Sequence, residues 1–190
     1  MPAPALLQNT LYFECRKHTD LYLWASKTPN GPSAKLFIQN IHTMDELKMT
    51  GNCLKGSRPL LIFDQAFDDA GSPHLGLLKE MFTQMFGVPR TSRRVKPFVD
   101  HILSFSVLDG KVWFRNYQII EEDPGAEPTK GKRKPSGLDA DPTLVEIGPR
   151  FVMTPIRIFE GSFGGATLYE NPGELRRAWR TYRQAAFTDP

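Results

Sequence analysis

The sequence is poor in cysteine and contains no long hydrophobic run. Its 190 residues include two cysteines, Cys15 and Cys53, which form no CxxC pattern. This usage argues against a disulfide framework or a zinc ribbon and favours a reducing compartment. No apolar stretch approaches the roughly 18 residues of a membrane span, and the N-terminal MPAPALLQNT has no charged start typical of a signal peptide. We therefore expect no membrane partner.

The excess of positive over negative charge is also small. The formal net charge is +3, and 40% of the residues are hydrophobic, which is enough for a folded core. The basic residues nevertheless gather in clusters. This balance is compatible with a nucleic-acid partner but does not require one.

Motifs of nucleotide enzymes are missing. The glycine-rich stretch GSFGG at 161–165 has no Lys-Ser/Thr pair behind it and does not fit GxGxxG, so it predicts a tight turn. No serine lies in a nucleophile elbow, neither cysteine has an adjacent histidine, and the four histidines are isolated. These gaps give no support to nucleotide binding or nucleophilic catalysis, and we expect no cofactor.

One cluster of acidic residues could in principle bind a metal ion. Asp64, Asp68 and Asp69 follow an apolar run, as carboxylates do in metal-dependent nucleases. No other acid-rich motif accompanies them, and Asp68 and Asp69 precede a predicted helix N-terminus, where acids are favourable anyway. We therefore favour a structural role and expect no metal.

Alternating and helical patterns predict an α/β (α+β) fold. A strand meander is expected at 11–15, 20–26 and 34–41, a short helix capped by Thr43 and Glu46, and a buried strand from Leu60. The clearest helix begins after Ser72 and ends at Gly87, with one apolar face. That face is composed of Leu75, Leu78, Met81, Phe82, Met85 and Phe86.

The second half of the chain predicts a hairpin and a late strand pair. Asp109-Gly110 is a favoured two-residue turn between two alternating runs. Residues 121–142 have the composition of an unstructured loop, acidic first and then basic. Pro149 and Pro155 suggest edge positions or bulges in the strands that follow. Residues 173–190 read as a final basic helix.

Arginines and aromatic residues are the remaining candidates for function. Arginine forks onto phosphate, and aromatic rings stack on unpaired bases. The alternative is a solvated surface with ordinary sheet packing, and these residues alone do not decide between the two. The candidates lie in a basic loop (Arg90, Arg93, Arg94 and Lys96), in the hairpin (Trp113, Arg115 and Tyr117) and in the late strands (Arg150, Phe151 and Arg157).

Several ordered motifs resemble the Brix-domain family. NGPS, HTMDELK, LKGSRPLL, WFRNYQI and GPRF occur in this order, and the similarity extends over 11–172. The resemblance implies a Brix domain at 11–172 with two anticodon-binding-like halves, mixed sheets and flanking helices. It also implies a non-family leader at 1–10 and a first half shortened by one strand-helix unit.

The same resemblance implies a function. Members of the family are non-catalytic RNA-binding proteins of pre-ribosomes, so we expect a nuclear and nucleolar assembly factor of the large (60S) subunit. Its partners would be pre-rRNA and other assembly factors. The GPRF segment resembles an RNA-binding motif, which makes Arg150 the first candidate for a contact. The alternative is a protein-interaction scaffold in pre-ribosomes that does not recognise RNA directly.

Overall fold

The computed structural model describes residues 8–47, 50–87, 99–120 and 143–173. The predicted basic loop at 88–97, the loop at 121–142 and the final helix lie outside these residues. The elements, in chain order, are β1 (Asn9–Arg16), β2 (Asp20–Lys27), β3 (Ser33–His42), α1 (Met44–Leu47), β4 (Leu60–Phe63), the 3₁₀ helix η1 (Gln65–Asp68), α2 (Pro73–Phe86), β5 (His101–Leu108), β6 (Lys111–Ile120), β7 (Thr143–Glu146), β8 (Arg150–Gly161) and β9 (Gly164–Glu170).

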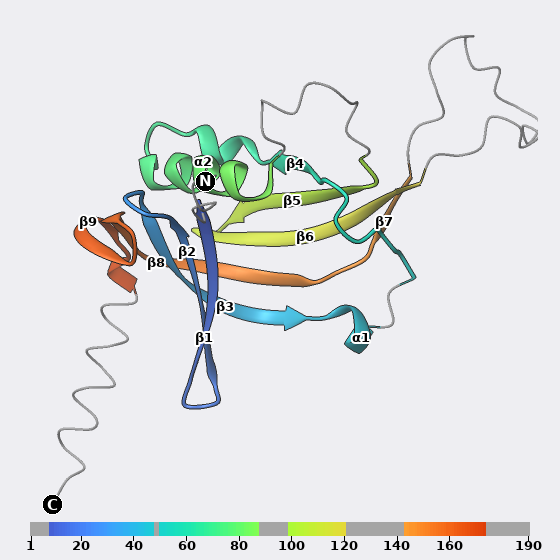
Figure 1. Cartoon of the computed structure of the whole chain (residues 1–190), viewed down its shortest axis with the longest axis horizontal. Coiled ribbons are helices and arrows are strands. Elements are labelled where there is room, and N and C mark those ends of the chain that lie inside the picture. The colour runs from blue at the N-terminus through green and yellow to red at the C-terminus, as the bar shows by residue number, and fades with distance from the viewer. Residues whose placement is uncertain (1–7, 48–49, 88–98, 121–142, 174–190) are drawn as a thin grey trace, which may run out of the picture.

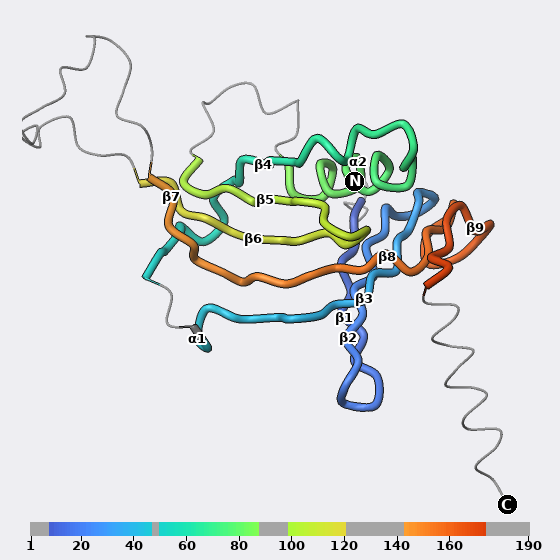
Figure 2. The backbone as a smooth tube through the Cα atoms, turned by 180° about the vertical axis from the view of Figure 1, so that it is seen from behind, coloured from blue at the N-terminus to red at the C-terminus, as the bar shows by residue number. Residues whose placement is uncertain are grey.

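All of these strands belong to one sheet. The order is β1-β2-β3-β8-β6-β5-β4, with β7 paired to β6 and β9 paired to β8. Among the strands of the described residues, only β4 and β5 pair in parallel. The predicted mixed α/β class is confirmed, and strands from both halves of the chain are hydrogen-bonded into a single sheet. Strand β8 lies between β3 and β6 and so joins the strands of the two halves (Figure 2).

Local turn chemistry explains the hairpins. Asp109 and Gly110 have φ angles of 53° and 69°, so the predicted two-residue turn joins β5 to β6. The GSFGG stretch forms the turn between β8 and β9, as predicted, with Gly165 at a φ of 98°. Pro155 lies beside a register shift between β3 and β8, which agrees with the expected bulge.

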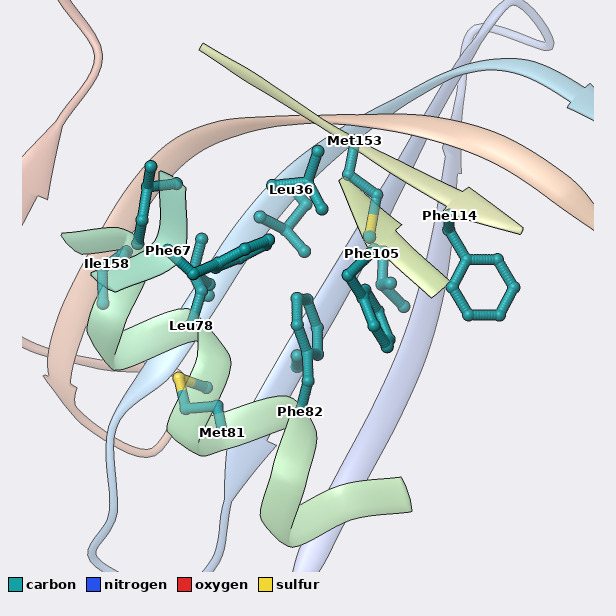
Figure 3. Packing of buried hydrophobic residues seen from close by; sticks show 14 of the residues in the cluster. Leu36, Phe67, Leu78, Met81, Phe82, Phe105, Phe114, Met153 and Ile158 are labelled. Atoms are coloured by element: carbon teal, nitrogen blue, oxygen red, sulfur yellow. The ribbon is translucent and has the colours of Figure 1, made fainter. Parts of the chain in front are cut away.

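Helix α2 packs against one face of the sheet, which we call the covered face (Figure 3). The predicted apolar stripe of this helix points into the core: Leu75, Leu78, Met81 and Phe82 are buried. They meet inward residues of several strands, among them Leu36, Phe105 and Met153. The opposite side of the sheet is called the open face below.

Some details of the helix ends differ from the predictions. Ser72 is the N-cap residue of α2, but its side chain makes no capping hydrogen bond. Glu46 was expected to cap the short helix together with Thr43, and its carboxylate lies 3.1 Å from Nδ1 of His42. Gly87 ends α2 as predicted, although its φ is −70°. The reason for glycine is steric, because a Cβ there would stand 2.3 Å from the carbonyl oxygen of Thr83.

Candidate nucleic-acid interface

The middle of the open face is built by alternate residues of β6 and β8. In β6, Val112 and Phe114 are buried on the covered face, so Trp113 and Arg115 project to the open face. Trp113 is the cross-strand partner of Val152 in β8. Arg150 precedes Val152 by two residues and therefore faces the same side.

A pocket of about 270 Å³ opens between these side chains. It brings together four of the predicted RNA-binding residues, Trp113 and Arg115 of β6 with Arg150 and Phe151 of β8. The complete lining consists of Asn40, His42, Trp113, Phe114, Arg115, Arg150, Phe151 and Val152. The strands that carry these residues, β6 and β8, lie side by side in the sheet (Figure 1).

Glu146, at the end of β7, connects the two arginines. One of its carboxylate oxygens lies 4.0 Å from Arg115 and 3.7 Å from Arg150. These are long ion pairs, and the arginine side chains are 41% and 36% exposed. Both guanidinium groups therefore keep donors that a phosphate could reach.

Two polar atoms near the pocket have no hydrogen-bond partner. Nε1 of Trp113 is buried and unpaired, and so is the second carboxylate oxygen of Glu146. Buried polar groups in folded proteins are nearly always hydrogen-bonded. Both atoms are enclosed by the protein, so a ligand would contact them only after a rearrangement of these side chains.

Phe151 lines the pocket although its ring packs against the core, and the other predicted residues do not line it. Tyr117 is opposite Glu146 in the β6–β7 pairing. The ring of Phe151 stacks on Phe114 at a centroid distance of 4.6 Å and packs against the core. Arg157 lies further along β8 and forms an ion pair with Glu170 of β9. Arg90, Arg93, Arg94 and Lys96 fall outside the described residues.

Sequence reasoning missed several members of the site. Glu146 is the main one, and its spacing of four residues from Arg150 was the only local signal. Asn40 and His42 reach the pocket because β3 pairs with β8, with His42 opposite Arg150. No local pattern announces this pairing, since the two strands are more than a hundred residues apart.

A second polar cluster lies at the start of β5. Asp100, His101 and Ser57 are within hydrogen-bond distance of one another. The carboxylate and the hydroxyl both approach Nδ1 of His101, at 2.6 Å and 3.2 Å. A catalytic triad needs them on different ring nitrogens, so this cluster has a structural geometry.

The cluster anchors the loop before β4 through Asp100. Its second oxygen accepts a hydrogen bond of 2.7 Å from the Leu54 amide. Burial alone would raise the pKa of Asp100, but hydrogen bonds from His101, Ser57 and Leu54 outweigh it. Together they lower the pKa to about 2. The carboxylate is therefore charged at neutral pH.

The predicted acidic cluster does not converge. Asp68 binds Lys79 of α2 at 2.6 Å, and Asp69 accepts a hydrogen bond from the Gly71 amide. Asp64 accepts a long one, of 3.4 Å, from the Val107 amide. Within the described residues, no group of three or more His, Cys, Asp or Glu side chains is arranged to hold a metal ion. In the same ranges, no helix has the length and hydropathy needed to cross a bilayer.

Comparison with known proteins assigns the chain to a family. The model of the Brix domain matches residues 6–157. The chain therefore belongs to the Brix-domain family, which confirms the resemblance in the sequence. The proposed division of the chain at residues 10 and 172 stays a prediction.

Curated relatives carry more specific names. The chain is 58% identical to "Ribosome biogenesis protein BRX1" of Saccharomyces cerevisiae over 163 residues, which are 86% of this chain and 53% of the relative. It is 57% identical to the Homo sapiens "Ribosome biogenesis protein BRX1 homolog" over 162 residues, 85% of this chain and 40% of that protein. "Ribosome biogenesis protein BRX1 homolog 2" of Arabidopsis thaliana is 55% identical over 165 residues, 86% of this chain and 49% of the relative. The chain spans about half the length of these relatives.

Proposed function

We propose that this chain is a non-catalytic ribosome assembly factor that binds pre-rRNA of the large (60S) subunit. One observation carries the RNA-binding part: Arg115 and Arg150 converge with Trp113 on one pocket of the open face. The relatives named ribosome biogenesis proteins support the assembly role. The site of action would then be the nucleus and nucleolus, with other large-subunit assembly factors as neighbours.

The chemistry of the pocket fits a nucleotide within an RNA chain. Two guanidinium groups joined by one carboxylate form a positive end that suits a phosphate. Trp113 lines the same pocket and provides an aromatic side chain beside them. Arg157 on β8 and the basic residues at 90–96 would extend the contact along the backbone.

The direct test is UV crosslinking of tagged protein in cells, followed by sequencing of the attached RNA. We expect enrichment of large-subunit rRNA at one locus and a strong loss with Arg150→Glu. Lys55→Glu is the matched control, because it makes the same charge change at an exposed loop residue. A crosslinking profile that is equal in both variants would remove Arg150 from the interface.

A measurement with purified protein separates electrostatic contact from folding. Each phosphate that loses its partner should reduce the slope of log affinity against log salt by about 0.7 on single strands and about 0.9 on duplexes. Arg150→Gln and Arg115→Gln should each lower the slope by this amount and leave the melting temperature unchanged. An unchanged slope in both variants would argue against the pocket as an RNA site.

One observation favours the alternative that the chain is a protein-interaction scaffold without direct RNA recognition. Leu60 and Ile62 of the edge strand β4 are 50% and 44% exposed, as expected for a strand that a partner protein covers. Under this alternative, the protein enters pre-ribosomal particles and crosslinks to no RNA. The same crosslinking experiment therefore distinguishes the two functions.

A further inference from the structure

A second group of aromatic side chains lies on the open face, away from the pocket. It occupies β1, β2 and β3, the adjacent part of β8 and the turn between β8 and β9. Arg157 lies in this part and follows Arg150 by seven residues on β8, which corresponds to roughly 20 Å along the strand. We call this group the aromatic surface, and it consists of Tyr12, Tyr22, Trp24, Phe37, Phe159 and Phe163.

Strand register aligns these residues across the sheet. Trp24 is opposite Tyr12 of β1 and Lys35 of β3, and Lys35 is opposite Arg157 of β8. One row of cross-strand neighbours therefore runs from an exposed tyrosine through a tryptophan to two cations. In the adjacent row, the rings of Tyr22 and Phe37 lie 5.3 Å apart.

The rings and the cations are in direct contact. Trp24 stacks on Phe159 at 6.0 Å, with an interplanar angle of 13°. Nζ of Lys35 lies 4.6 Å from the ring centre of Tyr22 and 5.0 Å from that of Trp24. These distances are within the range of cation–π attraction. Burial, and then the neighbouring Arg16, lower the pKa of Lys35 below its ordinary value, although Glu14 acts in the opposite direction.

Phe163 is held outward at the tip of the β8–β9 hairpin. Its ring is 6.0 Å from that of Trp24, and the residue is 45% exposed. Its φ of 58° is in the left-handed region, which bulky residues rarely adopt. Hydrogen bonds fix it there: the Phe163 amide donates to Oγ of the buried Ser33, and Oγ of Ser162 donates to the Lys27 carbonyl.

The left-handed backbone makes Phe163 a poor choice for stability alone. Glycine or asparagine would occupy such a turn position at lower cost. A conformational cost that the surrounding contacts maintain is a sign of a functional requirement, and the exposed ring is the part that a ligand can use. Tyr12, which is 55% exposed, is the second accessible ring.

We propose that the aromatic surface is a second RNA contact that takes unpaired bases of single-stranded RNA, with Phe163 and Tyr12 as stacking rings and Lys35 and Arg157 at phosphates. The inference rests on the proposed RNA-binding function and adds a separate surface to it. Open sheets that display aromatic rings are a recurrent platform for unpaired bases, because every base has a π-face.

The charged groups on this surface argue against an apolar protein partner. Three cations, Arg16, Lys35 and Arg157, accompany three acids: Glu14 and Glu170 are paired with those cations, and Asp20 is opposite Arg16 in the β1–β2 register. An apolar protein surface would remove these ionised groups from water, which is costly. A single RNA strand can stack its bases on the rings while its phosphates stay solvated beside the cations.

The test uses the full chain and fluorescence anisotropy with two probes, a ten-nucleotide oligouridine and a fully paired RNA hairpin. Phe163→Asn removes the ring and suits a left-handed backbone, so the melting temperature should stay equal or rise. We expect its affinity for oligouridine to fall roughly tenfold, because each stacked base contributes substantially to binding. Affinity for the hairpin should change much less.

The matched control is Phe13→Ser. Phe13 is 51% exposed on the same strand as Tyr12 but on the opposite face, so its loss should leave both affinities unchanged. If Phe163→Asn retains wild-type affinity for oligouridine while Arg150→Gln weakens binding, the aromatic surface is not an RNA site and the proposed function stands. If the wild type binds neither probe at physiological salt, both proposals are wrong. An equal loss with Phe13→Ser would also contradict the inference.

Discussion

The two faces of the sheet use the same strands in opposite ways. On the covered face, β6 presents Val112 and Phe114, which are buried in a continuous apolar core under α2. On the open face, the alternate residues Trp113 and Arg115 line a pocket with long ion pairs, and the indole N–H of Trp113 is buried without a partner. One strand therefore supplies stability and a candidate site from alternate residues.

This difference separates the expected consequences of substitution. Rings in contact on the covered face contribute through burial, and their loss should lower the free energy of unfolding. Cations on the open face form exposed pairs that contribute little to stability, so their loss should change binding instead. The covered face is not apolar throughout. Its far end lies under the polar loop at 51–57, which is joined to it by hydrogen bonds, and not under α2.

The largest effect is expected for Phe105→Ala at the centre of the covered face. The ring of Phe105 lies 4.9 Å from that of Phe63, 5.0 Å from Phe82 and 5.3 Å from Phe114. Removing it leaves a cavity among aromatic rings that cannot close, which typically costs about 3–5 kcal/mol. Chemical denaturation of the purified chain measures this free energy of unfolding.

The neighbouring residue supplies the control. Ser106 follows Phe105 on β5, points to the open face and is exposed. Ser106→Ala should change the free energy of unfolding by less than about 0.5 kcal/mol. A loss below about 1 kcal/mol for Phe105→Ala would mean that the two faces do not differ as described.

A smaller loss of stability is expected for Asp100→Asn, which tests the polar end of the covered face. The carboxylate accepts hydrogen bonds from Ser57 and the Leu54 amide and is paired with His101. Asparagine keeps the shape and removes the charge, so the cost should be about 1–2 kcal/mol. Urea denaturation at neutral pH gives the value.

The pH dependence of the stability tests whether the charge of Asp100 stabilises the fold. The folded state lowers the pKa of Asp100 from 3.8 to about 2, so the charged carboxylate stabilises the fold at higher pH. This contribution is fully present above about pH 4 and is lost as the pH falls towards 2. The difference in stability between wild type and Asp100→Asn should therefore shrink over this interval. A difference that stays constant down to pH 2 would refute the role of the charge.

Local patterns predicted the elements of both faces well. The alternation around Trp113 and the turn at Asp109-Gly110 define the β5–β6 hairpin, because both signals lie within a few residues. The apolar stripe of α2 predicted which side chains are buried under it, such as Leu78 and Phe82. Period and turn chemistry are local properties, so a single sequence carries them.

The pairing between distant strands could not be predicted in the same way. β3 meets β8 with Lys35 opposite Arg157 and His42 opposite Arg150, and two register shifts interrupt the ladder. Such a register depends on how both faces pack at once. Consequently, the sequence pointed to Arg115 and Arg150 separately, while their shared partner Glu146 and the aromatic surface emerged only from the structure.

The smallest effect is expected for Glu146→Gln, which tests the electrostatics of the open face. Its carboxylate lies 3.7 Å from Arg150 and 4.0 Å from Arg115, and it occupies the position where a phosphate would approach them. Removing the charge should cost at most about 1 kcal/mol of stability. It should also strengthen binding of an rRNA fragment by about threefold, since a negative charge no longer competes for the arginines.

Glu80→Gln on α2 is the matched control for this last comparison, because it removes the same charge from an exposed residue of the helix on the covered face. Its effect on affinity should be smaller than that of Glu146→Gln at low salt, and both should diminish at high salt through screening. Weaker binding by Glu146→Gln would mean that the carboxylate positions the two arginines and does not compete with the ligand. In that case the open face would depend on a fixed arrangement of charges, as the covered face depends on fixed packing.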